Sequence, residues 1–188
     1  MTELSARIVG HNPRGDPQKD DFYATPAKTT QALLKKEGFF GRIWEPCCGE
    51  GHMSEVLIDE GYTVESSDLV DRGYGTSKVD FLMETEVRAN IITNPPYKDA
   101  EAYVRQAIRL SEKKCALLLR LNFLEGIKRR SLFESDPPVR VYVFSRRQAL
   151  MKNGEDYSGR GGMMALAWFV WDNSFPTDYT NEPVLGWI

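Results

Sequence analysis

The chain has 188 residues, a formal net charge of −3, and the apolar and charged fractions of an ordinary globular protein. Its length suits a single domain with a sizeable core. No apolar run is long enough to span a membrane and no hydrophobic segment opens the sequence, so the composition argues against a membrane or exported protein and predicts a cytoplasmic one.

Residues 1–20 are polar and contain prolines and a glycine, so we expect a flexible tail before a single domain over residues 21–188. The pattern from Ala27 to Glu37 predicts the first helix, with Pro26 in its first turn. Strands are expected over residues 43–46, 62–67, 77–81, 90–93, 115–121, 139–144 and 164–171, and further helices over residues 52–60, 99–112 and 123–135.

This alternation of strands and helices predicts an α/β fold with a doubly wound, mostly parallel sheet of seven strands. No helical pattern separates the last two strands, which permits an antiparallel hairpin at the edge of the sheet. The run Trp168-Phe169-Val170-Trp171 is more typical of sheet core than of a base-stacking surface.

The first strand leads into a glycine-rich turn, because residues 43–51 read Ile-Trp-Glu-Pro-Cys-Cys-Gly-Glu-Gly. The glycines allow the backbone to approach a ligand closely, but the Lys-Ser/Thr pair of a phosphate-gripping loop is missing. We therefore do not expect a nucleoside triphosphate here. Glu45, at the tip of the strand, would orient the glycine loop, and its structural alternative is a helix cap or a solvated charge.

A second polar corner follows a later strand, where residues 91–97 read Ile-Ile-Thr-Asn-Pro-Pro-Tyr. Prolines stop a strand, so Asn94 and Tyr97 are expected at its carboxyl end, where open α/β sheets bind ligands. Asn94 offers an amide oxygen as acceptor and Tyr97 a flat face, which together suit a planar group that carries an amine. A plain Asn-Pro-Pro turn is the structural alternative.

Together these motifs resemble the class I S-adenosylmethionine-dependent methyltransferases, and more narrowly those that modify adenine N6. The resemblance covers residues 21–172 and implies the Rossmann-like methyltransferase fold with S-adenosyl-L-methionine as cofactor. It implies a catalytic role for Asn94, Pro95, Pro96 and Tyr97. It implies cofactor binding by Tyr23, Thr25, Pro26, Glu45, Pro46, Gly49, Gly51, Asp68, Asp80 and Phe81.

Within this set, the resemblance places Asp68 on the cofactor ribose and the pair Asp80-Phe81 at its adenine, and it would let Glu45 bond the methionine amine. Asp68 could instead be a helix cap or a solvated charge, and Thr25 could cap the helix that follows it as readily as contact the cofactor.

The expected substrate is DNA. The run over residues 119–126 resembles orphan enzymes carried by phages and prophages, which implies a bacterial or phage-infected cell. Residues 113–160 hold eleven lysines and arginines against five acids, a net +6 that indicates either a basic binding face or a solvated helix surface. The long polar segment 145–163 would contact nucleic acid through Arg146, Arg147, Lys152 and Arg160, or else be disordered.

Other substrates remain open, because Asn-Pro-Pro-Tyr also occurs in enzymes that methylate RNA adenine or a protein glutamine amide. A non-catalytic nucleic-acid-binding protein that retains the fold is an alternative of another class. No separate target-recognition domain fits into the sequence, so specificity would be loose, depend on the 145–163 segment, or come from a homodimer or an accessory partner.

The three cysteines, Cys47, Cys48 and Cys115, do not indicate a disulfide framework, because two are adjacent and their number is odd. No Cys-x-x-Cys pair exists and the two histidines are scattered, so we expect no metal site. Cys47 and Cys48 are expected to lie as inert small side chains beside the cofactor loop.

Overall fold

The computed structural model describes residues 23–148, 164–174 and 182–188. The predicted tail and most of the 145–163 segment, including Lys152 and Arg160, lie outside the described residues. In the described part of the chain, no helix has the length and apolar character needed to cross a membrane.

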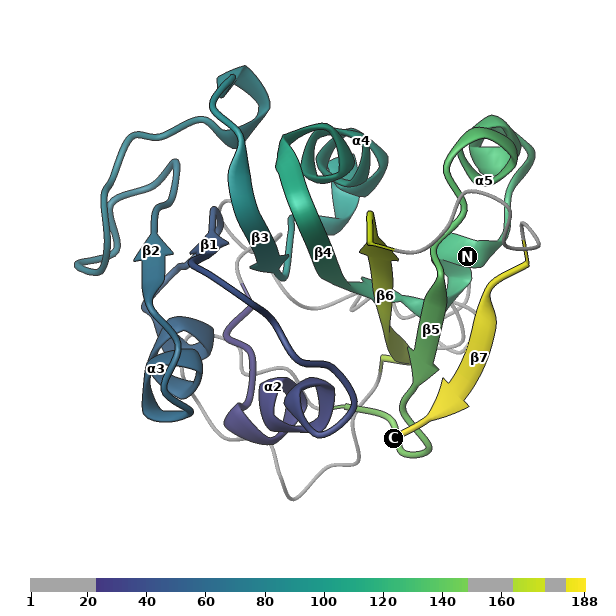
Figure 1. Cartoon of the computed structure of the whole chain (residues 1–188), viewed down its shortest axis with the longest axis horizontal. Coiled ribbons are helices and arrows are strands. Elements are labelled where there is room, and N and C mark those ends of the chain that lie inside the picture. Colours follow the sequence, from purple (N-terminus) through teal and green to yellow (C-terminus); the bar gives the residue numbers. More distant parts are fainter. Residues whose placement is uncertain (1–22, 149–163, 175–181) are drawn as a thin grey trace, which may run out of the picture.

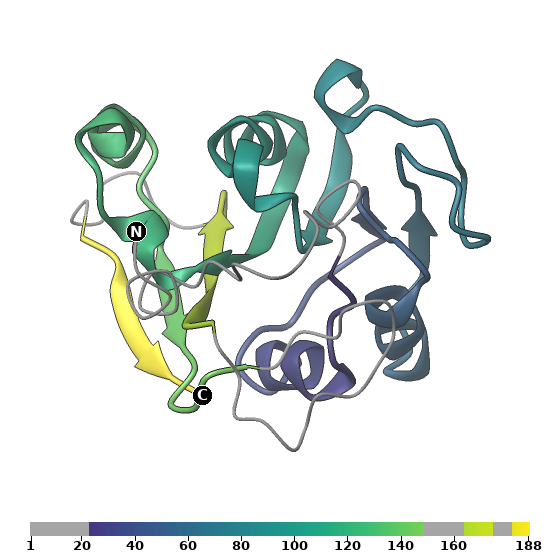
Figure 2. The same cartoon turned by 180° about the vertical axis from the view of Figure 1, so that it is seen from behind.

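Seven strands form one sheet in the order β2-β1-β3-β4-β6-β5-β7 (Figure 1). They are β1 (Ile43–Glu45), β2 (Val64–Ser66), β3 (Arg88–Thr93), β4 (Ser111–Arg120), β5 (Arg140–Val143), β6 (Leu166–Asp172) and β7 (Val184–Trp187). Neighbouring strands are parallel, except that β6 runs antiparallel to both β4 and β5. The α/β class and the antiparallel β5–β6 hairpin are therefore confirmed, with β7 added outside the hairpin, as the view from behind also shows (Figure 2).

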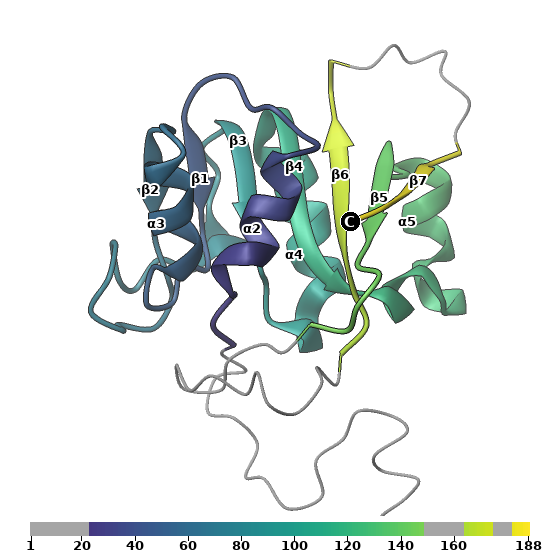
Figure 3. The same ribbon diagram turned by 90° about the horizontal axis from the view of Figure 1, so that it is seen from below.

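Helices cover both faces of this sheet. The helices α2 (Ala27–Leu34) and α3 (His52–Asp59) lie on one face, and α4 (Ala100–Leu110) and α5 (Arg130–Ser135) lie on the other (Figures 1 and 3). Because successive side chains of a strand point to opposite faces, β4 and β6 contribute to two separate cores. The run Trp168–Trp171 in β6, predicted to belong to the core, is buried throughout. Its first three side chains are fully inaccessible to solvent, and Trp171 is 5% exposed.

Three sequence predictions are corrected by the structure. Residues 77–81 do not form a strand, because Lys78 adopts a positive φ of 62° and Asp80 caps the short 3₁₀ helix η2 (Phe81–Met83). The predicted helix 123–135 is divided into η4 (Leu121–Leu124), η5 (Ile127–Arg129) and α5, with Gly126 at a φ of 108° between the first two. The strand β7 was not predicted, because its apolar side chains are exposed and follow no alternation.

Candidate functional site

The sheet brings four polar side chains to one edge. Four neighbouring parallel strands, in the order β2-β1-β3-β4, end together at this edge. The residues at or just after their carboxyl ends are, in the same order, Asp68, Glu45, Asn94 and Arg120. Parallel sheets bind ligands at this edge, so the topology assembles a site from residues up to 75 positions apart in the sequence, the separation of Glu45 and Arg120.

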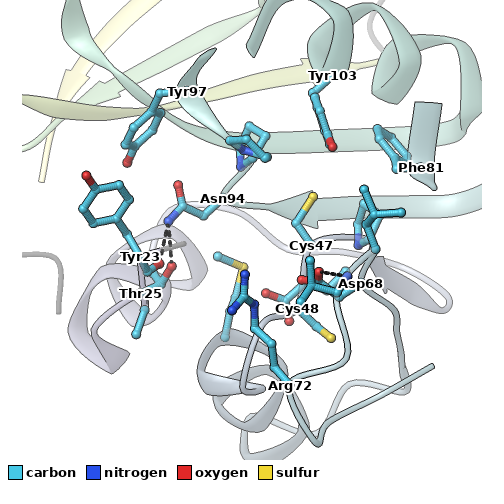
Figure 4. A pocket seen from close by; sticks show the side chains of 18 of the residues that line it. Tyr23, Thr25, Cys47, Cys48, Asp68, Arg72, Phe81, Asn94, Tyr97 and Tyr103 are labelled. Carbon is cyan, nitrogen blue, oxygen red and sulfur yellow. Dashed lines mark hydrogen bonds between the residues drawn. The ribbon is translucent and has the colours of Figure 1, made fainter. Parts of the chain in front are cut away.

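These side chains line a single cavity of about 750 Å³. Both sequence motifs contribute to its lining, the first through Glu45, Pro46 and Cys47 and the second through Asn94–Tyr97. Figure 4 shows Cys47, Asn94 and Tyr97 around this cavity. The predicted site residues that line this cavity are Tyr23, Thr25, Glu45, Pro46, Asp68, Phe81, Asn94, Pro95, Pro96 and Tyr97.

Asn94 is held in one orientation by the segment that precedes α2. Its Nδ2 donates to the backbone carbonyl of Tyr23 at 3.3 Å and to Oγ1 of Thr25 at 3.1 Å. A backbone carbonyl only accepts, so the amide nitrogen must be the atom that faces it. The amide oxygen Oδ1 is consequently turned the other way, where it is buried and has no hydrogen-bond partner among the described residues. A buried acceptor left in this state is costly unless a ligand or water supplies a donor.

Thr25 does not cap α2, which was one of the two roles expected for it. The N-cap of α2 is Pro26, and no side chain caps the helix. Thr25 is 5% exposed, lines the cavity, and uses its hydroxyl to position Asn94.

Tyr97 has aromatic and cationic neighbours. The guanidinium of Arg120 lies 4.7 Å from the centroid of its ring, a cation–π distance. The ring of Tyr23 lies 6.1 Å away at an interplanar angle of 30°. Tyr97 and Tyr23 thus lie beside the Asn94 amide in the lining of the same cavity (Figure 4).

Asp68 connects the end of β2 to the glycine turn. Its Oδ2 accepts from the backbone N–H of Gly49 at 2.9 Å, and its Oδ1 accepts from that of Val70 at 2.9 Å. Each carboxylate oxygen has a second lone pair, so Asp68 can brace the turn and still accept from a hydroxyl in the cavity.

Glu45 is the buried acid of the site. It is 2% exposed, and the hydroxyl of Ser54 in α3 donates to its Oε2. Burial raises the pKa of Glu45 to about 8, against the opposing effect of the Ser54 hydrogen bond, and the nearby Asp68 adds to the rise. The carboxyl is therefore largely protonated at neutral pH.

An apolar wall closes the cavity beside α4. Phe81 stacks on Tyr103 with ring centroids 5.5 Å apart, and Val79 lies next to them in the lining. Cys47 and Cys48 also line the cavity as free thiols. Burial raises the pKa of both thiols, to about 12 for Cys48, so neither is a nucleophile at neutral pH.

Several predicted site residues lie outside the cavity lining, namely Pro26, Gly49, Gly51, Asp80, Arg146 and Arg147. The carboxylate of Asp80 accepts from the backbone N–H of Leu82 at 3.0 Å and so caps η2. The close approach expected at Gly51 is made by a side chain of the protein, since a Cβ built there would lie 2.5 Å from the ring of Tyr74.

The sequence reasoning missed several lining residues, the most informative being Arg72, Lys98, Tyr103 and Arg120. Arg120 could have been predicted from the sequence, because it is the polar residue that ends an apolar strand, and this strand pairs with the one that leads to Asn94. Arg72 and Tyr103 follow no motif and are placed by the path of the chain alone (Figure 4).

No protein-family model and no curated protein matches this sequence. Solved structures do match. One is the modification subunit of a putative type I restriction enzyme from Vibrio vulnificus YJ016, with a TM-score of 0.59 and 13% identity over 93% of this chain and 48% of that chain. This chain thus spans about half the length of that protein.

Two further likenesses cover most of the compared protein. A putative RNA methyltransferase from Pyrococcus horikoshii has a TM-score of 0.60 and 11% identity over 91% of this chain and 98% of that chain. Magnesium protoporphyrin IX methyltransferase from Synechocystis PCC 6803 was solved with bound S-adenosylmethionine. It has a TM-score of 0.52 and 14% identity over 78% of this chain and 79% of that chain. These likenesses show that the chain has the Rossmann-like methyltransferase fold.

Proposed function

We propose that this protein is an S-adenosylmethionine-dependent methyltransferase that acts on an exocyclic amino nitrogen, namely adenine N6 in DNA. One observation carries the proposal: Asn94 lines the cavity, and its amide oxygen Oδ1 is fixed, buried and without a hydrogen-bond partner among the described residues. An amine N–H is one of the donors from which such an oxygen can accept.

The residues around the cavity fit the cofactor. About 750 Å³ is within the range of cavities that hold small ligands. Asp68 keeps free lone pairs for ribose hydroxyls, and Phe81, Val79 and Tyr103 offer an apolar wall for a purine. Asp80 does not reach the lining, so we assign the purine contact to Phe81 and not to that carboxylate.

The chemistry follows from the difficulty of the acceptor. Bound S-adenosylmethionine supplies an electrophilic methyl group, whereas an adenine amine is a weak nucleophile because its lone pair is delocalised into the ring. Asn94 Oδ1 would accept one N–H of this amine and the Pro95 carbonyl the other, which favours a tetrahedral nitrogen with a localised lone pair. As the N–CH3 bond forms and the S–CH3 bond breaks, with S-adenosylhomocysteine as the leaving group, preorganised acceptors stabilise the positive charge that develops on nitrogen. No strong base is needed before attack, because the methylated nitrogen can release its proton to water afterwards.

Positioning of the base completes the proposal. The ring of Tyr97 offers a stacking face, which contributes about 1–3 kcal/mol per base in single-strand binders. In duplex DNA the target base must first rotate out of the helix. Arg146 and Arg147 are exposed and lie outside the cavity lining, so we assign them, with Lys152 and Arg160, to the DNA backbone and not to the base.

The DNA assignment is supported by the likeness to a restriction enzyme's modification subunit and by the sequence resemblance to orphan enzymes of phages. RNA adenine is the second candidate, since the matching structures also include a putative RNA methyltransferase and a 23S rRNA methyltransferase, the latter with a TM-score of 0.55.

The test incubates the protein with methyl-labelled cofactor and, separately, duplex DNA, single-stranded DNA, RNA and protein, followed by nucleoside analysis of the product. We expect label in N6-methyladenine from DNA. Label only in RNA would select the second candidate, and label only in protein would contradict both. Asn94→Ala should abolish transfer while cofactor affinity, measured by calorimetry, stays close to wild type. Equal transfer by wild type and Asn94→Ala would refute the site assignment.

A further inference from the structure

A second cavity of about 450 Å³ adjoins the first one. The two share part of their lining, namely Tyr97, Lys98, Asp99 and Arg120. The second cavity continues along η4 to Asn122 and Phe123, within the 119–126 run that resembles phage enzymes, and to Arg129 just after it. The proposed function of the Asn94 site leaves this cavity without a role.

Arg120 stands at the boundary between the two cavities. It ends β4, and its guanidinium covers one face of the Tyr97 ring. Its Nε is buried and has no acceptor among the described residues. In the described part of the chain, no carboxylate forms an ion pair with Arg120. A partly buried cation in this state calls for an anionic ligand.

Arg129 supplies a second guanidinium, which the preceding turn holds in place. Its Nε donates to the Phe123 carbonyl at 2.9 Å, and its Nη2 donates to the carbonyls of Asn122 and Glu125. Its guanidinium also lies 5.0 Å from the centroid of the Phe123 ring. Backbone carbonyls orient the group but leave its positive charge uncompensated.

The remaining charges favour an anion as well. Lys98 adds a third cation, against Asp99 and Glu101 among the acids of the lining. Glu101 is already paired with Arg105 at 2.9 Å. Guanidinium groups match the geometry of phosphate oxygens, and arginine is the residue most often used to bind them.

We propose that this second cavity binds the backbone phosphate of the nucleotide adjacent to the methylated base, with Arg120 as its main contact. The inference rests on the proposed function, because it needs a nucleic-acid strand whose target base lies against Tyr97. A base in the first cavity places its flanking phosphate at the shared wall, where Arg120 and Lys98 are. Arg120 is then a positioning residue that couples phosphate binding to the ring against which the base stacks.

The test removes the phosphate charge and the arginine charge separately and together. The substrate is an oligonucleotide that contains the adenine methylated by wild type, with single phosphates on either side replaced by neutral methylphosphonate. We expect one of these replacements to lower the kcat/KM of wild type by about tenfold, the range of one charge-assisted contact. In Arg120→Gln, the same replacement should cost less than about twofold, because the two changes remove one interaction.

A second variant keeps the test valid if Arg120→Gln does not fold. Lys98 is exposed, so Lys98→Gln should fold normally and show the same coupling in weaker form. Lys128→Gln is the matched control, because Lys128 is exposed, carries the same charge and lines neither cavity. If Arg120→Gln and Lys98→Gln both kept the full sensitivity of wild type to methylphosphonate, this inference would be overturned, whereas the proposed function would stand. Wild type that transfers methyl to no DNA or RNA would overturn the proposed function, and this inference with it.

Discussion

Thr25 and Asn94 are joined by a hydrogen bond of 3.1 Å although 69 positions separate them in the sequence. Together with the Tyr23 carbonyl, Thr25 uses both N–H donors of the Asn94 amide. The segment before α2 therefore fixes the orientation of this amide. The Thr25 hydroxyl thus links this segment physically to the Asn-Pro-Pro-Tyr motif.

Thr25→Val should lower kcat for methyl transfer by about tenfold, because the lost hydrogen bond lets the Asn94 amide rotate away from its productive orientation. Valine has nearly the shape of threonine, so packing is preserved. Thr25→Ser keeps the hydroxyl and is the matched control. Single-turnover kinetics with labelled cofactor measures the effect, and a Thr25→Val enzyme as fast as Thr25→Ser would contradict the positioning role.

The position of a site residue could be predicted from the sequence where a recognisable motif marks the end of a strand. An apolar run that meets prolines locates Asn94 at the carboxyl end of β3, and a run that meets glycines locates Glu45 at the end of β1. Because parallel strands end at one edge, the two motifs had to lie near each other. The hydrogen bond that orients Asn94 was not predictable, since it depends on how the segment before α2 crosses that edge.

The errors in the predicted strands also have physical causes. Residues 77–81 look like a strand, but the carboxylate of Asp80 competes for the backbone by capping η2. The exposed strand β7 lacks a buried face and so leaves no alternating pattern. Its register comes from pairing with β5, for example Val141 with Leu185, and local sequence carries no information on such pairing.

Gly51→Ala should destabilise the protein by about 2–4 kcal/mol, because the new Cβ would collide with the Tyr74 ring and the residue must keep a φ of +88°. Chemical denaturation measures the loss. Gly61→Ala is a matched control, since Gly61 has the same φ of +88° with nothing within 4 Å of its Cβ position. Gly61→Ala should therefore cost only the backbone strain, about 1 kcal/mol.

The same collision can be isolated by a double variant. In a Tyr74→Ala background, Gly51→Ala should cost no more than Gly61→Ala costs in wild type. An undiminished cost in that background would show that Tyr74 does not explain the requirement for glycine at position 51.

Glu37→Gln should destabilise the fold by about 3–5 kcal/mol, because it breaks a buried ion cluster, and Glu37 lines neither cavity. Glu37 accepts from Lys114 at 2.7 Å, from Tyr142 at 2.8 Å and from Arg140, which also donates to Asp172 at 2.7 Å. Burial alone would raise the pKa of Glu37, but these hydrogen bonds outweigh it and hold the pKa below its usual value.

The sign of the pH dependence follows from this lowered pKa. The stabilisation by Glu37 is present above its unfolded pKa of 4.5 and is lost as the pH falls toward the lower folded value. The free energy of unfolding of wild type should therefore drop more steeply than that of Glu37→Gln between pH 6 and pH 3 (about the titration range of carboxyl groups). Parallel curves for the two proteins would contradict the assignment.

Glu45 should produce the opposite pH dependence, because its folded pKa of about 8 lies above its unfolded value of 4.5. Between these values the folded state holds a proton that the unfolded state has released, so stability falls as the pH rises from 4.5 to about 8. Glu45→Gln mimics the protonated acid, keeps its shape and removes this dependence. Denaturation of the cofactor-free protein at both ends of that range should thus show a stability gap between Glu45→Gln and wild type that widens toward alkaline pH. A gap that stays constant would mean that Glu45 is ionised in the folded protein, and the description of it as the neutral, buried acid of the cavity would be wrong.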